Sequence, residues 1–149
     1  MYEYRCTIIK VVDGDTVDVD IDLGFDIVLR GVRIRVHGID TPESRTSDKI
    51  EKQFGLASKE KVKSLIPEGS QQILRTIKDR DGGDAKGKFG RILGDFLVKY
   101  NSEDKLLTEI MIDECFAVRY YGQNKADIEI AHLANRNALL HSGIVTLNN

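Results

Sequence analysis

Hydrophobic and polar residues alternate strictly in the run TVDVDIDLG at residues 16–24. A period of two predicts a strand with one buried face and one solvated, here acidic, face. The β-branched run YRCTIIKVV before it and the run DIVLRGVRIRV after it predict a strand on either side, with turns at Asp13-Gly14 and at Gly24. The sequence up to residue 36 therefore predicts an antiparallel meander of three strands.

The pattern changes to helical spacing after this meander. The apolar residues between 50 and 65 lie near a helical period, with Ser47 as the candidate N-cap and Pro67 as the stop signal. Gly55 lies inside the run and argues against an unbroken helix, because glycine is a poor helix former. We expect one helix here.

The second half of the chain predicts two more strands and two more helices. The strands are QQILRTIKD and RILGDFLVKY, joined by the polar, glycine-rich loop RDGGDAKGKFG. A short helix is expected from about Asp104 to Glu114 and a longer one from about Ala126 to Ser142, before Gly143. No repeat or linker divides the chain, so we expect a single domain over residues 1–149.

Five strands with a helix between the third and the fourth, and helices at the end, indicate an α+β domain rich in β-structure. A five-stranded Greek-key barrel would close such short strands without long open edges. The pattern alone fits other five-stranded sheets equally well.

Composition narrows the class of protein. The chain is 41% hydrophobic and 31% charged, which is typical of a soluble globular protein. It has no run near the roughly 20 apolar residues of a membrane span and no secretory signal pattern, so we expect a cytoplasmic protein without membrane contact. A longer precursor whose signal had been removed would give the same sequence. Cys6 and Cys115 are too few for a disulfide framework and are expected to be buried free thiols.

Charge limits how the chain can bind nucleic acid. The net charge is −2, which excludes a surface covered in positive charge. Any surface that binds a polyanion must therefore be local.

Several carboxylates lie in turns or at strand ends. If the second and third strands are neighbours, Asp15 and Asp40 lie at the same end of the sheet and converge. Two converging carboxylates repel each other unless a cation lies between them, and Ca²⁺ prefers carboxylate and carbonyl oxygens. An EF-hand loop is excluded, because DVDIDLG has Leu23 where that loop requires glycine, and DRDGGD places Gly90 at the final ligand position.

Three motifs, DGDT at 13–16, RVHGIDTPE at 35–43 and GKFGR at 87–91, resemble in sequence and order those of the staphylococcal nuclease (thermonuclease) family. The resemblance covers most of the chain. It implies an OB-fold, five-stranded Greek-key barrel with three packed α-helices, and a calcium-dependent phosphodiesterase, an endonuclease that hydrolyses DNA and RNA. By motif position it implies that Asp15, Asp40 and the Thr41 carbonyl bind calcium. It implies that Glu43 activates or orients the attacking water, and that Arg35 and Arg91 bind the scissile phosphate.

These roles are chemically reasonable, yet each residue has an ordinary alternative. A carboxylate ionised at neutral pH can accept a proton from water, and a guanidinium offers forked donors to phosphate oxygens. Arg35 can equally be a polar-face arginine like Arg33, Arg91 can pair with Asp95, and Glu43 can stabilise a helix start. The joint spacing favours the catalytic interpretation. The three histidines are expected to be structural or solvated.

The third motif and the region after the second helix depart from the family pattern. Gly87 and Phe89 replace the aspartate and tyrosine that commonly flank the lysine, here Lys88. Phe89 can stack on a base but has no hydroxyl to donate to phosphate, whereas Lys88 can still contact phosphate. Tyr120 and Tyr121 lie near the family's nucleotide pocket, but adjacent residues on a strand point to opposite faces, so we expect at most one of them to stack on a base.

Two functions of different classes remain. The first is the calcium-dependent nuclease, with single-stranded DNA and RNA as the favoured substrates and a monomer as the expected state. The alternative is a catalytically inactive OB-fold module that binds single-stranded nucleic acid or a protein partner. A pure binding module has no need of the full catalytic set, so its presence favours the enzyme. A calcium-binding structural protein would leave the two arginines unexplained.

Overall fold

The computed structural model describes residues 2–77 and 91–148. Its main sheet has six strands: β1 (Tyr2–Asp13), β2 (Thr16–Gly24), β3 (Ile27–Val36), β5 (Gln71–Thr76), β6 (Ile92–Tyr100) and β7 (Glu103–Leu106). The two short strands β4 (Ile39–Asp40) and β8 (Val118–Arg119) pair separately. The helices are α1 (Lys49–Leu65), α2 (Leu107–Asp113) and α3 (Lys125–His141).

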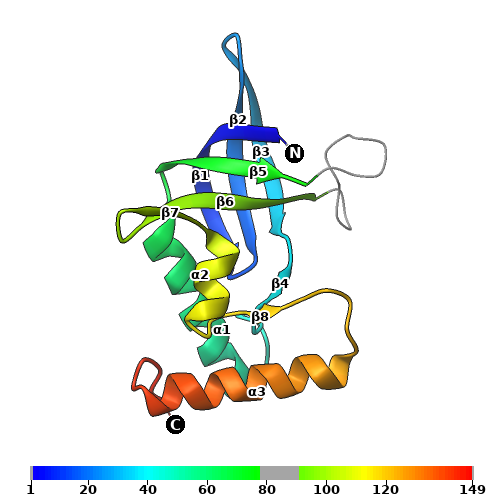
Figure 1. Cartoon of the computed structure of the whole chain (residues 1–149), viewed down its shortest axis with the longest axis vertical. Coiled ribbons are helices and arrows are strands. Elements are labelled where there is room, and N and C mark those ends of the chain that lie inside the picture. Colours follow the sequence, from blue (N-terminus) through cyan, green and yellow to red (C-terminus); the bar gives the residue numbers. More distant parts are fainter. Residues whose placement is uncertain (1, 78–90, 149) are drawn as a thin grey trace.

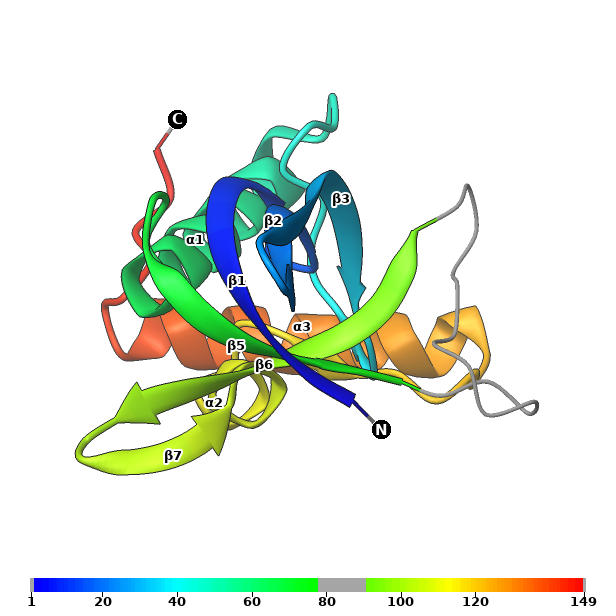
Figure 2. The same cartoon turned by 90° about the horizontal axis from the view of Figure 1, so that it is seen from above.

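The main sheet closes on itself. Its strand order is β3-β2-β1-β5-β6-β7, and β3 also pairs in parallel with β6 through Ile34 and Ile92. This extra pairing joins β1, β2, β3, β5 and β6 into a barrel, whose strands curve around one axis in the view from above (Figures 1 and 2). The expected α+β fold, an OB-like barrel with three helices, is confirmed.

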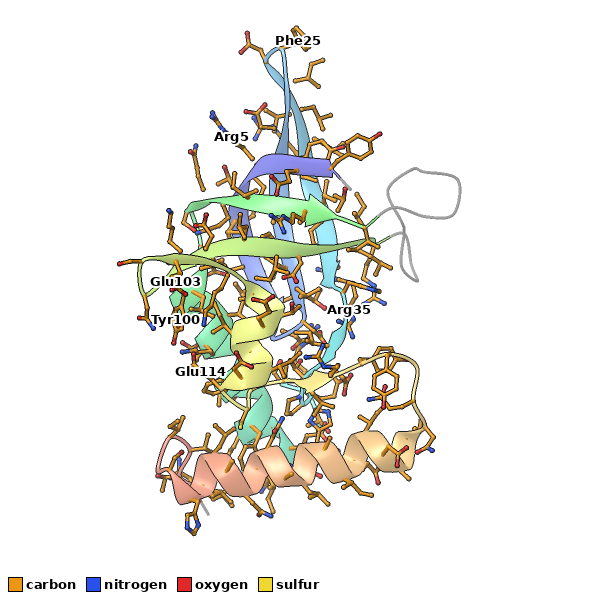
Figure 3. All side chains as sticks on the ribbon, in the orientation of Figure 1. Arg5, Phe25, Arg35, Tyr100, Glu103 and Glu114 are labelled. Carbon is orange, nitrogen blue, oxygen red and sulfur yellow. The ribbon has the colours of Figure 1, made fainter. Side chains whose placement is uncertain are left out.

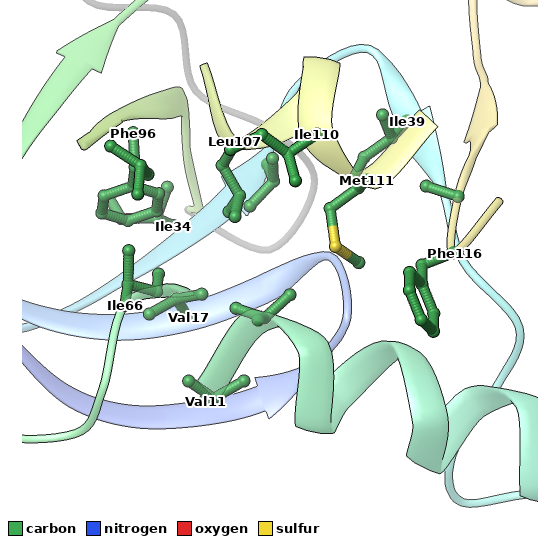
Figure 4. Close-up of a cluster of buried hydrophobic side chains, with 14 of the residues drawn as sticks. Val11, Val17, Ile34, Ile39, Ile66, Phe96, Leu107, Ile110, Met111 and Phe116 are labelled. Carbon is green, nitrogen blue, oxygen red and sulfur yellow. The ribbon is translucent and has the colours of Figure 1, made fainter. Parts of the chain in front are cut away.

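The barrel is filled by the hydrophobic residues that the strand pattern turns inward. Val17, Val19 and Ile21 of β2 are all buried, as the alternation predicts. Residues from α1 and α2 complete the core at one end of the barrel (Figure 4). Leu23 breaks the pattern and is 45% exposed, because β1 pairs with β2 only as far as Asp22 and the β2–β3 hairpin extends beyond it.

Helix α1 begins one residue later than predicted and is not interrupted. Its N-cap is Asp48 rather than Ser47, and the Asp48 carboxylate accepts hydrogen bonds from the amides of Ile50 and Glu51. Gly55 lies within the helix because a Cβ there would be 2.3 Å from the carbonyl oxygen of Glu43. The glycine thus allows the turn that carries Glu43 to lie directly against α1.

The segment 104–114 differs from the prediction at its start. Residues Glu103–Leu106 form β7 in a hairpin with β6, and α2 begins only at Leu107. In the part of the chain that the structure describes, no helix is long and apolar enough to cross a membrane. Cys6 is buried and Cys115 is half-buried, and both are free thiols.

Candidate active site

The turn between β1 and β2 places Asp15 beside Arg35 of β3. Thr16 pairs with Arg35 in the β2–β3 register, so the residue before Thr16 lies next to the arginine. The Asp15 carboxylate oxygen Oδ2 is 3.6 Å from Nη2 of Arg35, and the Val36 amide donates to the Asp15 carbonyl at 2.8 Å. The structure therefore brings together two of the predicted site residues.

Arg35 is held in place from the other side by backbone carbonyls. Its guanidinium donates to the carbonyl of Val36 and, at 2.8 Å, to that of Ile39 in β4. The side chain is largely buried and lies at the end of β3, between the barrel and α3 (Figure 3). Because Ile39 directly precedes Asp40, these contacts fix Arg35 next to the turn that carries the second half of the site.

That turn brings Asp40, Thr41 and Glu43 toward the same end of the barrel. Thr41 is buried, and the Glu43 amide donates to the Glu51 carboxylate of α1 at 3.1 Å. Oδ2 of Asp40 is 2.7 Å from Nε2 of His132 on α3, within hydrogen-bond distance. The Asp40 side chain is thus oriented by a helix near the end of the chain.

The pKa of Glu43 is raised by its surroundings, which include several other carboxylates. Partial burial raises this pKa above its ordinary value, and the charges of Asp15, Asp13, Glu51 and Asp40 raise it further. Carboxylates from the β1–β2 turn, from β4 and from α1 therefore all act on Glu43. Such a concentration of negative charge favours a cation at this end of the barrel.

The oxygen donors present fit a hard divalent cation. The predicted ligands are the carboxylates of Asp15 and Asp40 and the carbonyl of Thr41, which are the ligand types that Ca²⁺ takes together with water. Oδ1 of Asp15 accepts the Thr16 hydroxyl at 3.1 Å. Among residues 2–77 and 91–148, no three Asp, Glu, His or Cys side chains form a ready metal cluster. A cation here would therefore need carbonyl or water oxygens besides the two aspartates.

An acidic groove of about 560 Å³ lies between the Asp40–Glu43 turn and α3. It has two cationic side chains, Lys125 and Arg136, and a larger number of carboxylates, namely Asp40, Glu43, Asp48, Glu51 and Glu129. Tyr120, 44% exposed, is part of the lining, whereas Tyr121, 76% exposed, is not. Of the two adjacent tyrosines, the structure therefore places Tyr120 at the site.

A basic pocket of about 300 Å³ lies at the same end of the barrel, around the β1–β2 turn. It is lined by Val12, Asp13, Thr16, Arg33, Arg45 and Arg91. Arg91 precedes Ile92, the residue of β6 that pairs with Ile34 of β3, so the parallel pairing delivers Arg91 here. The predicted second arginine thus lies in the basic pocket, together with Thr16, the residue after Asp15.

The alternative role expected for Arg91 was an ion pair with Asp95, but the Asp95 carboxylate accepts hydrogen bonds from other residues. Asp95 is buried and accepts hydrogen bonds from the Phe96 amide and from the amide and hydroxyl of Thr108. It therefore anchors the start of α2. Two of the predicted substrate-binding residues, Lys88 and Phe89, lie outside the described residues.

Sequence reasoning missed His132, which was expected to be structural or solvated. Its contact with Asp40 joins residues 92 positions apart, so no local motif could reveal it. The available signal was its spacing of seven from Leu139, the buried residue of α3, because residues seven apart share one face of a helix. The sequence analysis also did not identify Arg45, whose guanidinium is 3.6 Å from Asp13.

Comparisons with known proteins agree with this geometry. The family model described as staphylococcal nuclease homologue matches residues 33–139. The chain is 28% identical over 145 residues to the SPbeta prophage-derived endonuclease YokF of Bacillus subtilis (strain 168), covering 94% of this chain and 45% of that protein. It is 28% identical over 128 residues to the Micrococcal nuclease of Shigella flexneri, covering 81% of this chain and 62% of that protein. The chain thus spans about half the length of these relatives. With more than half of its residues matched by the family model, the chain belongs to the staphylococcal nuclease homologue family.

Proposed function

We propose that this chain is a calcium-dependent phosphodiesterase that cleaves DNA and RNA, with single strands as the favoured substrate. The observation that carries the proposal is the contact of Asp15 with Arg35, held beside the turn of Asp40 and Glu43. Family membership and the names of the two relatives, an endonuclease and a micrococcal nuclease, support the reaction class. The substrate and the metal are part of the proposal.

Each residue has a role that follows from its chemistry. Arg35 is fixed by carbonyls and offers its remaining donors to the oxygens of the scissile phosphate. Glu43 accepts the proton of the attacking water, or orients that water. Arg91, from the basic pocket, neutralises charge that develops on the phosphate.

The carboxylates of Asp15 and Asp40 and the carbonyl of Thr41 would hold the calcium ion. A bound Ca²⁺ would supply polarisation of a phosphoryl oxygen and a fixed position for the water. His132 keeps the Asp40 carboxylate in one orientation, as the hydrogen-bond partners of metal ligands commonly do. Tyr120 in the acidic groove is placed to stack on a base of a single strand.

An assay with end-labelled single-stranded DNA and RNA, in calcium or in excess chelator, tests the proposal. We expect cleavage of both polymers in calcium and none in chelator. Glu43→Gln should lower the rate by about 10²–10⁴-fold, because it removes the proton acceptor. Glu60→Gln, on the exposed side of α1, is the matched control and should be unaffected.

The possible outcomes separate the two candidate functions. Binding of single strands without any cleavage in calcium would favour the inactive OB-fold module. Undiminished cleavage by Glu43→Gln would contradict the assigned mechanism while leaving a nuclease.

A further inference from the structure

The basic pocket contains two arginines, Arg33 and Arg45, that the chemistry of the scissile phosphate does not use. They line it together with Arg91, one carboxylate residue, Asp13, and Thr16. Arginine clusters of this kind suit phosphate, because each guanidinium presents several donors in a fixed plane. Neither Arg33 nor Arg45 has a role in the proposed reaction.

Both of these arginines are held in position and remain accessible. Arg33 donates from Nε and Nη2 to the two carboxylate oxygens of Asp18, at 2.8 and 3.0 Å, which leaves Nη1 available. Nη2 of Arg45 is 3.6 Å from Asp13, whose other carboxylate oxygen accepts the Ser44 hydroxyl. The Arg33 side chain is 50% exposed and that of Arg45 is 73% exposed. A ligand can therefore reach donors of both side chains.

The two sides of the site differ in charge. The acidic groove has five carboxylates and two cationic side chains, whereas the basic pocket has three guanidiniums and one carboxylate. Asp18, outside the pocket lining, offsets part of the charge of Arg33. The remaining excess of guanidiniums makes the pocket the more favourable of the two surfaces for a backbone phosphate. With a net charge of −2 for the whole chain, the basic pocket provides the local positive surface that binding of a polyanion requires.

The spacing along β3 links the pocket to the reaction. Arg33 and Arg35 are two residues apart on one face of the strand, which separates them by about 6.6 Å. Successive phosphates of an extended single strand are spaced similarly. When one phosphate lies at Arg35, the neighbouring phosphate of the same strand can reach the donors of the basic pocket.

We propose that Arg33 and Arg45, which line the pocket together with Arg91, bind the backbone phosphate adjacent to the one that is cleaved. This inference rests on the proposed function, because it assigns the polymer a path across that same site. Arg33 and Arg45 are then specificity-determining residues, which favour polynucleotides over substrates with a single phosphodiester.

Binding of fluorescently labelled oligothymidylate by the full chain in chelator, followed by anisotropy at several salt concentrations, tests this site without cleavage. Arg45→Gln should weaken binding about 3- to 10-fold at low salt and reduce the slope of log K against log salt by about 0.7, the value for one lost contact to a single strand. Arg33→Gln should behave similarly. A labelled dinucleoside monophosphate, which has only one phosphate, should bind all the proteins equally.

Arg30→Gln is the matched control. Arg30 lies on the same strand, is 79% exposed and is 3.3 Å from Asp20, yet it does not line the pocket. Its substitution should leave affinity and salt slope unchanged, and circular dichroism should show that all three variants are folded.

The results distinguish this inference from the proposed function. If the wild type binds and cleaves single strands but Arg45→Gln and Arg33→Gln match Arg30→Gln, the phosphate pocket is wrong and the nuclease stands. If the wild type neither binds nor cleaves the oligonucleotide, the proposed function itself is wrong. If Arg33→Gln and Arg45→Gln weaken binding of the dinucleoside monophosphate as much as binding of oligothymidylate, the pocket does not bind a neighbouring phosphate.

Discussion

Individual carboxylates in this protein have very different surroundings, and Asp95 is the most buried of those whose pKa is clearly raised. Its oxygens accept hydrogen bonds from Phe96 and Thr108, which favour the ionised form, but burial outweighs them and raises the pKa of Asp95 to about 6. Ionised Asp95 therefore lowers the stability of the folded state relative to protonated Asp95.

This residue predicts how stability depends on pH. Because the folded state binds the Asp95 proton more tightly than the unfolded chain, its contribution is fully present below pH about 4 and is lost as the pH rises to about 6. The shift corresponds to about 3 kcal/mol of unfolding free energy. Urea denaturation at pH 4 and pH 7 should show a difference between wild type and Asp95→Asn that changes by about this amount. Asp104→Asn, an exposed carboxylate beside Lys99, should follow the wild type; if Asp95→Asn does so too, the pKa assignment is wrong.

At the same scale, the sequence indicated which candidate residues lie at the ends of paired strands. Arg35 pairs with Thr16, the residue after Asp15, so the proximity of Asp15 and Arg35 follows from the strand register and the position of the turn. The contacts of His132 and Arg45 were not predictable, because they depend on how α3 and the segment before α1 pack on the barrel. Packing of distant segments leaves no local period in a sequence.

Among the elements, α1 supports the turn that carries Glu43. The Glu43–Ser44 backbone lies against the helix at Gly55, and the Glu51 carboxylate accepts the Glu43 amide. The position of Glu43 thus depends on the absence of a side chain at Gly55, nearly two turns into the helix.

Gly55→Ala tests this support. Helix propensity alone favours alanine by about 1 kcal/mol. The added methyl group would lie 2.3 Å from the Glu43 carbonyl oxygen, so we expect a net destabilisation of about 1–3 kcal/mol, together with slower cleavage. Thermal unfolding and the cleavage assay measure the two effects. Glu60→Ala, on the exposed side of α1, should change neither; a Gly55→Ala protein as stable and active as wild type would show that the close contact is unimportant.

The strands and helices themselves were predicted where periodicity is long. Strands β1, β2, β3, β5 and β6 and helices α1 and α3 were all anticipated, because each has enough residues to show its pattern. Strands β4 and β8 have two residues each and show no period. The start of the segment 104–114 was wrong because pairing with β6 overrides the helix preference of Glu103–Leu106.

At the scale of the whole molecule, closure of the barrel brings residues of the first two motifs and Arg91 of the third to one end. The parallel pairing of β3 with β6 delivers Arg91 to the end of the barrel that the β1–β2 turn and β4 already occupy. The charges there separate into an acidic groove and a basic pocket, although the chain as a whole has a net charge of only −2. A cation between the carboxylates and a phosphate beside the arginines is the arrangement that this separation favours.

The central claim is that Asp15 and Asp40, from two different elements, hold one calcium ion. Isothermal titration of the full chain with Ca²⁺ tests it most directly. We predict one ion per wild-type chain and affinity lowered by more than about tenfold in both Asp15→Asn and Asp40→Asn, because each removes a charged ligand. Asp104→Asn should bind like the wild type. Calcium affinity that is unchanged in both site variants, or no calcium binding by the wild type, would contradict the account.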